Sequence, residues 1–253
     1  MGRLLGGDGA PCRAPQAGSW AAARRLTDRA GSAVVVTALA GTNLTQHVLG
    51  WPWRVRPIEA GALLALARLQ GLGWAELGLS RQRVPSGCRW GLGAVASVAA
   101  VYCAGVLVPV TRPAFRDSRY DLPLREVLFP AFVVIPLGTV MSEEIAFRSV
   151  LWGVLSRHSR QAQVLVTTSA LFGVWHVLPA RRIAGTNQAV SGAAGGRGTA
   201  VVVPATVALT TLGGVVFGEL RRRSGSVLAP IAAHWATNAL GVLFGVVSRH
   251  LGG

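Results

Sequence analysis

The amino-acid sequence predicts an all-α protein, a polytopic transmembrane helical bundle of about seven spans (six to eight). Composition is the first reason: of the 253 residues, 51% are hydrophobic and only 14% are charged, and the mean hydropathy is +0.45. A soluble domain is nearer a quarter charged. The second reason is that the apolar residues gather in long runs, each near the ~20 residues that a helix needs to cross a ~30 Å hydrocarbon core.

Residues 1–30 mix Gly, Ala and Pro with arginines, which is typical of a basic, poorly ordered N-terminal tail. The remaining residues, 31–253, are expected to form one transmembrane helical domain. Its apolar segments cover, in order, residues 32–50, 58–75, 90–111, 124–156, 161–179, 199–221 and 226–248.

Some segments have features of their own. Arg68 interrupts the second segment, which weakens it as a span. The fourth segment is long and contains Pro130 and Pro136, so we expect either a kinked span or a re-entrant piece followed by a span. Residues 179–198 are rich in Gly and are predicted to form a flexible loop. Small-residue spacing that favours close helix packing occurs in Gly214-x-x-x-Gly218 and Gly241-x-x-x-Gly245.

The net charge is +15, and all 25 basic residues are arginine. Such basicity often indicates nucleic-acid binding, but these arginines fall mostly between the apolar runs. Membrane lipids with anionic headgroups are therefore the expected partners, and nucleic acid is not. A modest excess of arginine on the N-terminal side predicts a multi-pass protein of the cell membrane with a cytoplasmic N-terminus. The odd number of cysteines (Cys12, Cys88 and Cys103) implies no disulfide framework.

Two adjacent carboxylates, Glu143 and Glu144, lie with Arg148 inside the apolar run from residue 127 to residue 155. A charge in such a place costs a few kcal/mol, so these groups must be neutralised or used. Glu144 and Arg148 are four residues apart on one helix face, in the order that favours an ion pair. Glu143 is rotated by about 100° from Glu144 and can therefore point elsewhere.

Two later segments carry polar residues at the same helical spacing, Phe172 with His176 and His234 with Asn238. At 1.5 Å per residue, Glu143 lies about 21 Å from the turn at residues 157–160, and His176 lies about 22 Å from it. His234 and Asn238 lie about 12 and 18 Å along a segment that starts from the same face of the membrane. We therefore expect Glu143, His176, His234 and Asn238 to converge on one cavity.

This set of residues suits two chemistries. In the first, Glu143 is a general base that takes a proton from water, His176 helps to hold that water, and His234 and Asn238 donate hydrogen bonds to the oxyanion of an attacked amide. In the second, Glu143, His176 and His234 ligate a divalent metal such as zinc, which activates the water. A compact H-E-x-x-H motif is missing, so the spacing alone does not demand a metal.

The three motifs, Glu143-Glu144-x-x-x-Arg148, Phe172-x-x-x-His176 and His234-x-x-x-Asn238, resemble those of the CPBP family, the CAAX-protease and bacteriocin-processing (Abi) proteins. The resemblance covers about residues 120–250, and residues 75–79 resemble a short segment common in the family. It implies a CAAX-protease-like fold and an intramembrane endopeptidase, glutamate-dependent and commonly labelled a metalloprotease. The substrate class that it implies is a membrane-embedded or lipid-tethered protein.

The resemblance also implies roles for the residues. Glu143 matches the catalytic base, with His176 assisting, and His234 and Asn238 match the oxyanion-stabilising pair. Glu144, Arg148 and Phe172 match supporting positions.

Two other functions are compatible with the same residues. A non-enzymatic immunity or scaffold protein would keep the polar cavity for structure alone, and alanine variants would then lose folding rather than activity. Buried Glu and His are also typical of proton-coupled transporters, but the chain shows no internal repeat of the kind that many transporters have.

Overall fold

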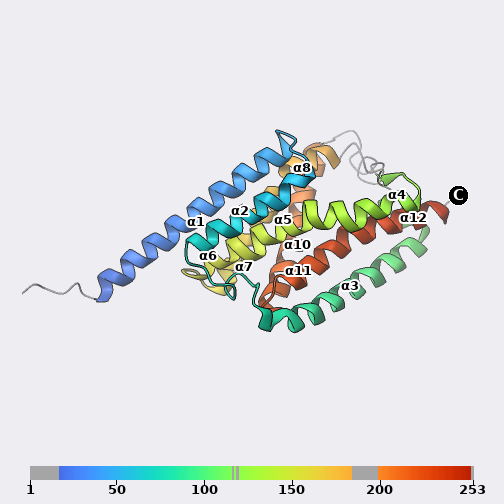
Figure 1. The fold of residues 1–253 in the computed structure, drawn as a ribbon. Coiled ribbons are helices and arrows are strands. Elements are labelled where there is room, and N and C mark those ends of the chain that lie inside the picture. The colour runs from blue at the N-terminus through green and yellow to red at the C-terminus, as the bar shows by residue number, and fades with distance from the viewer. Residues whose placement is uncertain (1–16, 116, 118–119, 184–198, 252–253) are drawn as a thin grey trace, which may run out of the picture.

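The computed structural model describes residues 17–115, 117, 120–183 and 199–251. These residues form helices joined by turns and short loops, which confirms the predicted all-α class (Figure 1). The helices are α1 (Ala17–His47), α2 (Arg56–Leu69), α3 (Val84–Leu107), a long composite helix (Leu124–Ser156), α7 (Gln161–Trp175), α8 (Val177–Ile183), α10 (Thr199–Ser224), α11 (Leu228–Trp235), a π-helical segment (Ala236–Leu240) and α12 (Gly241–His250).

Five helical stretches in the described part of the chain are long and apolar enough to cross a membrane. They coincide with the last five predicted segments and are Arg81–Leu107, Leu124–Ser156, Gln161–Arg181, Thr199–Ser224 and Leu228–His250. The α2 helix has 14 residues, about 21 Å, which is shorter than a hydrocarbon core. The count of seven spans is therefore not confirmed.

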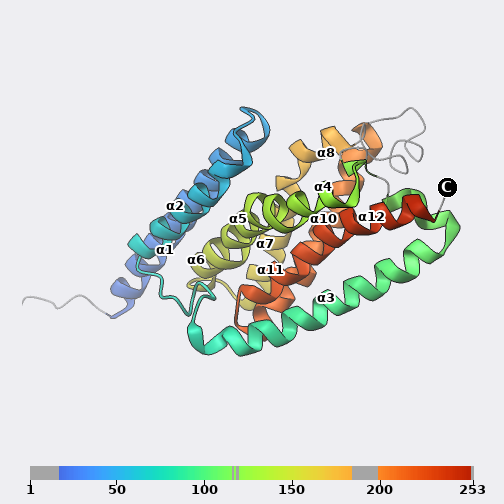
Figure 2. The ribbon, with the colours of Figure 1, turned by 45° about the vertical axis from the view of Figure 1, so that its right-hand side comes forward.

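Helix α1 begins at Ala17, inside the region expected to be a poorly ordered tail, while residues 1–16 lie outside the described residues. The boundary at residue 30 stays a prediction. Of the predicted loop at residues 179–198, the first part belongs to α8 and residues 184–198 lie outside the described residues. Helices α1 and α2 pack together on one side of the bundle, and α3 lies against α11 on the opposite side (Figure 2).

The composite helix is one continuous helical stretch, long and apolar enough to span a membrane, rather than two separate pieces. It consists of α4 (Leu124–Phe129), α5 (Met141–Glu144), α6 (Trp152–Ser156) and π-helical segments at Pro130–Val134, Pro136–Val140 and Ile145–Leu151. Two of the π-helical segments begin at a proline. Proline cannot donate to the carbonyl four residues back and clashes with it, and the wider π turn relieves that clash.

A short loop after α2 ties three helices together. Leu77 is fully buried, and its carbonyl accepts a hydrogen bond from Ser149 Oγ at 2.7 Å. The Gly78 carbonyl accepts one from the Val227 amide at 3.0 Å, and Gly78 has a φ of +71°, which favours glycine. The Glu76 carbonyl accepts one from Arg221 Nη2 at 2.9 Å. The loop includes residues 75–79, whose sequence resembles a short segment common in the CPBP family.

Arginines hold the same loop from two sides. Arg221 is buried, and its Nε donates to the Arg148 carbonyl at 2.9 Å. Arg157 donates from Nε to the Glu76 carboxylate at 2.8 Å, and this bond holds the pKa of Glu76 below its usual value. These arginines thus bind protein carbonyls and a carboxylate.

Helices α7 and α10 pack closely through glycines. An added Cβ on Gly214 would lie 2.9 Å from the Cα of Ser169 on α7. An added Cβ on Gly173 would lie 2.9 Å from the Val207 carbonyl oxygen on α10. The small-residue spacing at Gly214 therefore marks a real helix contact, as predicted.

Adjacent glycines on α10 allow a matched test of this contact. Gly214→Ala forces the backbone of Ser169 to shift, so we expect the free energy of unfolding to fall by about 1–3 kcal/mol. A Cβ on Gly213 meets nothing within 4 Å, so Gly213→Ala should leave stability unchanged or raise it by up to about 1 kcal/mol, because alanine favours helix. Unfolding in mixed micelles measures both variants. Equal effects would contradict the assigned contact.

Candidate active site

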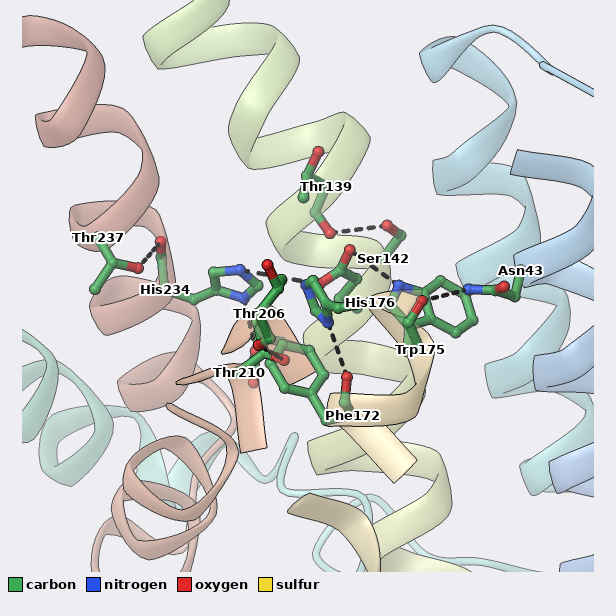
Figure 3. A network of polar contacts seen from close by, with 12 residues as sticks. Asn43, Thr139, Ser142, Phe172, Trp175, His176, Thr206, Thr210, His234 and Thr237 are labelled. Carbon is green, nitrogen blue, oxygen red and sulfur yellow. Dashed lines mark hydrogen bonds and ion pairs between the residues drawn. The ribbon is translucent and has the colours of Figure 1, made fainter. Parts of the chain in front are cut away.

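The predicted polar residues meet where the composite helix, α7 and α11 face one another. Glu143 and Glu144 close α5, His176 follows the last residue of α7, and His234 lies on α11. Figure 3 shows the imidazole rings of His176 and His234 next to each other, with Trp175 on the side away from His234. The structure thus brings together three of the four residues that were expected to converge.

Glu144 is held by two partners. Its Oε1 accepts a hydrogen bond from Arg148 Nη1 at 3.1 Å and another from His234 Nδ1 at 2.8 Å. Glu144 and Arg148 are fully buried. The ion pair with Arg148 confirms the prediction from the helical spacing, whereas the bond to His234 was not predicted. An ionised carboxylate only accepts hydrogen bonds, so Nδ1 of His234 carries a proton and Nε2 points away from Glu144.

Arg148 is surrounded by aromatic rings. Its guanidinium carbon lies 4.1 Å from the ring centre of Phe172, 5.2 Å from that of Phe217 and 5.9 Å from that of Phe147. Its Nη2 also donates to the Gly214 carbonyl at 3.3 Å. Ring faces carry negative potential, so the cluster stabilises a cation that has no access to water. Phe172, expected to be a supporting residue, is the ring nearest to that cation.

His176 is oriented by the end of α7. Its Nδ1 lies 2.8 Å from the Phe172 carbonyl oxygen, which can only accept. The proton is therefore on Nδ1, and the lone pair of the neutral ring is on Nε2. That Nε2 atom lies 3.8 Å from Glu143 Oε2.

Glu143 has one satisfied oxygen and one unsatisfied oxygen. Its Oε1 accepts a hydrogen bond from the indole Nε1 of Trp175 at 3.2 Å. Its Oε2 is buried without a hydrogen-bond partner and lies 3.8 and 3.9 Å from Nε2 of His176 and His234. Buried polar atoms are normally paired. Glu144 Oε2 and Arg148 Nε in the site also lack a hydrogen-bond partner among the described residues, and what distinguishes Glu143 Oε2 is that it faces two imidazoles.

Sequence reasoning missed Trp175 and its partner Asn43. The Trp175 carbonyl accepts a hydrogen bond from Asn43 Nδ2 at 3.0 Å, so α1 supports the residue that holds Glu143. The sequence contained one signal for each contact. Asn43 is a polar residue within an apolar segment, and the indole N–H of Trp175 needs a hydrogen-bond partner when it is buried.

Asn238 lies outside this group. In the described part of the chain it makes no hydrogen bond to Glu143, His176 or His234, and it lines a separate cavity of about 310 Å³ together with Thr139. The expectation that all four residues converge on one cavity is therefore wrong for Asn238. The reason is local: Asn238 lies in the π-helical segment Ala236–Leu240. A π turn takes more residues than an α turn, so the fourth residue after His234 does not return to the same face.

The cavity that Asn238 lines lies next to the group formed by Glu143, His176 and His234, displaced along the helix axes. Thr139 precedes Glu143 by four residues and Asn238 follows His234 by four, so each is about 6 Å along its helix from a site residue. The lining includes residues of α12 and of the segment before α4, and consists of Ala114, Phe115, Asp117, Tyr120, Ile135, Thr139, Thr237, Asn238, Gly241, Val242, Gly245 and Arg249.

The fit of a metal can be judged from the spacing of the donor atoms. Among the residues that the structure describes, no three His, Cys, Asp or Glu side chains are grouped so as to hold a metal ion. In the predicted set, Glu143 Oε2 lies 3.8 and 3.9 Å from the two imidazole nitrogens. Ligand atoms around tetrahedral zinc are about 3.3 Å apart. The side chains as placed do not fit zinc, and metal dependence stays a prediction.

Comparison with known proteins agrees with the motifs. Residues 125–240 match the model of the Rce1-like family, described as type II CAAX prenyl endopeptidase Rce1-like. The matched range contains all seven predicted site residues, and it confirms the resemblance to the CAAX-protease family. No curated protein and no solved structure matches the chain significantly. The match and the apolar helices together support a multi-pass membrane protein.

The buried ion pair can be tested by removing one partner. Arg148→Met leaves Glu144 buried with only His234 as partner, so we expect a loss of about 3–5 kcal/mol in the free energy of unfolding. Adding Glu144→Gln should restore part of that loss, because the unpaired charge is removed. Unfolding in mixed micelles measures both.

The matched control is Arg125→Met on the same composite helix. Arg125 forms an exposed ion pair with Glu126 at 3.6 Å, and exposed pairs contribute only about 0–1 kcal/mol. A loss at Arg148 no larger than that at Arg125 would contradict the assigned role of the pair.

Proposed function

We propose, from the family match over residues 125–240, that this protein is an intramembrane endopeptidase in which Glu143 is the general base. It hydrolyses a peptide bond of a membrane-embedded or lipid-tethered protein. The observation that carries the proposal is the Glu143 Oε2 atom, which is buried, lacks a hydrogen-bond partner and faces two imidazole nitrogens. We place the protein in the cell membrane with its N-terminus in the cytoplasm.

The attacking water binds between Glu143 and His176. Glu143 Oε2 and the neutral His176 Nε2 are both acceptors and lie 3.8 Å apart, so a single water molecule can donate one hydrogen to each. Trp175 holds the other carboxylate oxygen and thereby keeps Oε2 directed at this position. Glu143 takes the proton as the water oxygen attacks the carbonyl carbon.

The geometry points to His234 as the group that stabilises the oxyanion. Its Nδ1 lies 2.8 Å from Glu144 Oε1, and its Nε2 lies 3.9 Å from Glu143 Oε2. We infer that His234 carries a proton on each ring nitrogen when the oxyanion forms, one of them bound to Glu144. Its Nε2–H then points into the site and donates to the oxyanion. Asn238 donates from the adjacent cavity, into which the substrate segment extends.

The proposed hydrolysis needs no reagent other than water. The water oxygen forms a bond to the carbonyl carbon, and the carbon–nitrogen bond breaks as the tetrahedral intermediate collapses. The proton held by Glu143 passes to the leaving amine. The carboxylate of Glu143 is thereby regenerated, and the water oxygen remains in the new C-terminal carboxyl group of the product.

Removing the base should abolish cleavage. Glu143→Gln keeps the shape of the side chain but cannot take the proton, so we expect cleavage to fall at least a hundredfold. Membranes from cells producing wild type or Glu143→Gln are compared by mass spectrometry of protein termini. New termini should appear only with wild type. Glu126→Gln, an exposed glutamate on the same composite helix, should behave as wild type.

Two results would contradict this proposal. One is an unchanged set of new termini with Glu143→Gln protein that is present at normal levels. The other is the absence of new termini from all three membranes, which would favour a non-enzymatic role for the same fold.

Trp175 is proposed to position the base rather than to react. A hydrogen bond to a charged group contributes about 1.5–3 kcal/mol, so Trp175→Phe should lower kcat by roughly 10- to 100-fold, with KM little changed. Cleavage of a substrate identified from the new termini measures both constants. Trp235→Phe is the control, because its indole also loses a hydrogen bond, but to the Ala131 carbonyl. Equal effects on kcat would rule out a specific role for Trp175.

A further inference from the structure

A second, apolar cavity of about 630 Å³ lies between α3 and α10, with α11 contributing part of the wall. Most of its lining is aliphatic or aromatic, and the residues are Arg89, Trp90, Gly93, Ala94, Ser97, Val98, Val216, Phe217, Leu220, Ala233 and Thr237. On α3 these positions repeat every three or four residues and so form one face. From Arg89 to Val98 that face extends about 13 Å along the helix axis. The groove is therefore elongated and parallel to two helices long and apolar enough to span the membrane.

One end of the groove is positively charged. Arg89 belongs to the lining, and the Arg223 guanidinium carbon lies 5.8 Å from the ring centre of Trp90. Arg222 and Arg223 share one carboxylate, Glu219, at 2.6 Å each. Arg89 has no carboxylate partner in the described part of the chain. Three arginines and one glutamate leave a net charge of about +2 at this end, near the membrane surface.

We propose that this groove binds an anionic phospholipid. One acyl chain lies along the apolar face between α3 and α10, and the phosphate contacts Arg89 and Arg223. The polarity gradient fits this ligand, because hydrocarbon lies at membrane depth and a negative headgroup lies at the arginine end. A peptide segment fits less well, because its backbone would leave polar groups unsatisfied against an apolar wall.

The inner part of the groove touches the site that was described above. Phe217 lines the groove, and its ring stacks on His234 with centres 4.9 Å apart and planes at 22°. A bound acyl chain therefore packs against a ring that contacts both His234 and Arg148. The lipid stabilises the folded bundle by binding it and not the unfolded chain. This inference does not depend on the proposed protease activity.

The test uses the purified full-length chain in an uncharged detergent. Phosphatidylglycerol and phosphatidylcholine with identical acyl chains are titrated separately, and binding is followed by native mass spectrometry and by the thermal midpoint. We expect one phosphatidylglycerol to bind and raise the midpoint, and phosphatidylcholine to bind at least fivefold more weakly. Arg89→Gln should weaken phosphatidylglycerol binding about fivefold, the effect of one arginine near an anionic headgroup.

A second variant tests the acyl-chain position. Gly93→Leu places a side chain in the groove, and its Cβ meets no atom within 4 Å, so the fold can accept it. It should abolish the saturable binding. Gly61→Leu is the control, because Gly61 on α2 is equally open but lies outside the groove. Equal binding of the two lipids, or unchanged phosphatidylglycerol binding by Gly93→Leu, would overturn the proposal.

Discussion

The site depends on one buried carboxylate that serves two partners. Glu144 Oε1 accepts from Arg148 at 3.1 Å and from His234 at 2.8 Å, so a single oxygen links two helices through buried side chains. Arg148 is further held by aromatic rings and by the Gly214 carbonyl, which joins α10 to the same unit. Breaking a buried pair is costly. The arrangement therefore fixes His234 and leaves the neighbouring Glu143 free to face both imidazoles.

Helical periodicity predicted the parts of this site that lie within regular helix. The four-residue spacing of Glu144 and Arg148 gave their ion pair, and the rise per residue placed Glu143 and His176 at the same depth. The last five predicted apolar segments became the five stretches in the described residues that are long and apolar enough to span a membrane. These features follow from a fixed rise and rotation per residue, and so they can be read from spacing alone.

Departures from regular helix limited the prediction. Asn238 was expected on the face of His234, but the π-helical segment Ala236–Leu240 rotates it toward the neighbouring cavity. The bonds from Trp175 to Glu143 and from Asn43 to Trp175 join segments far apart in sequence, and no periodicity encodes them. The buried role of Arg221 was also missed, because an arginine at a helix end is usually exposed.

The central claim is that Glu143 directs a water molecule at a peptide bond. The most direct measurement is cleavage by the purified protein in water enriched in oxygen-18, with mass spectrometry of the product fragments. The account predicts that the new C-terminal carboxyl group carries one oxygen-18 atom and that the new amino terminus is free. A product without oxygen-18, or no peptide-bond cleavage of any membrane protein, would contradict it.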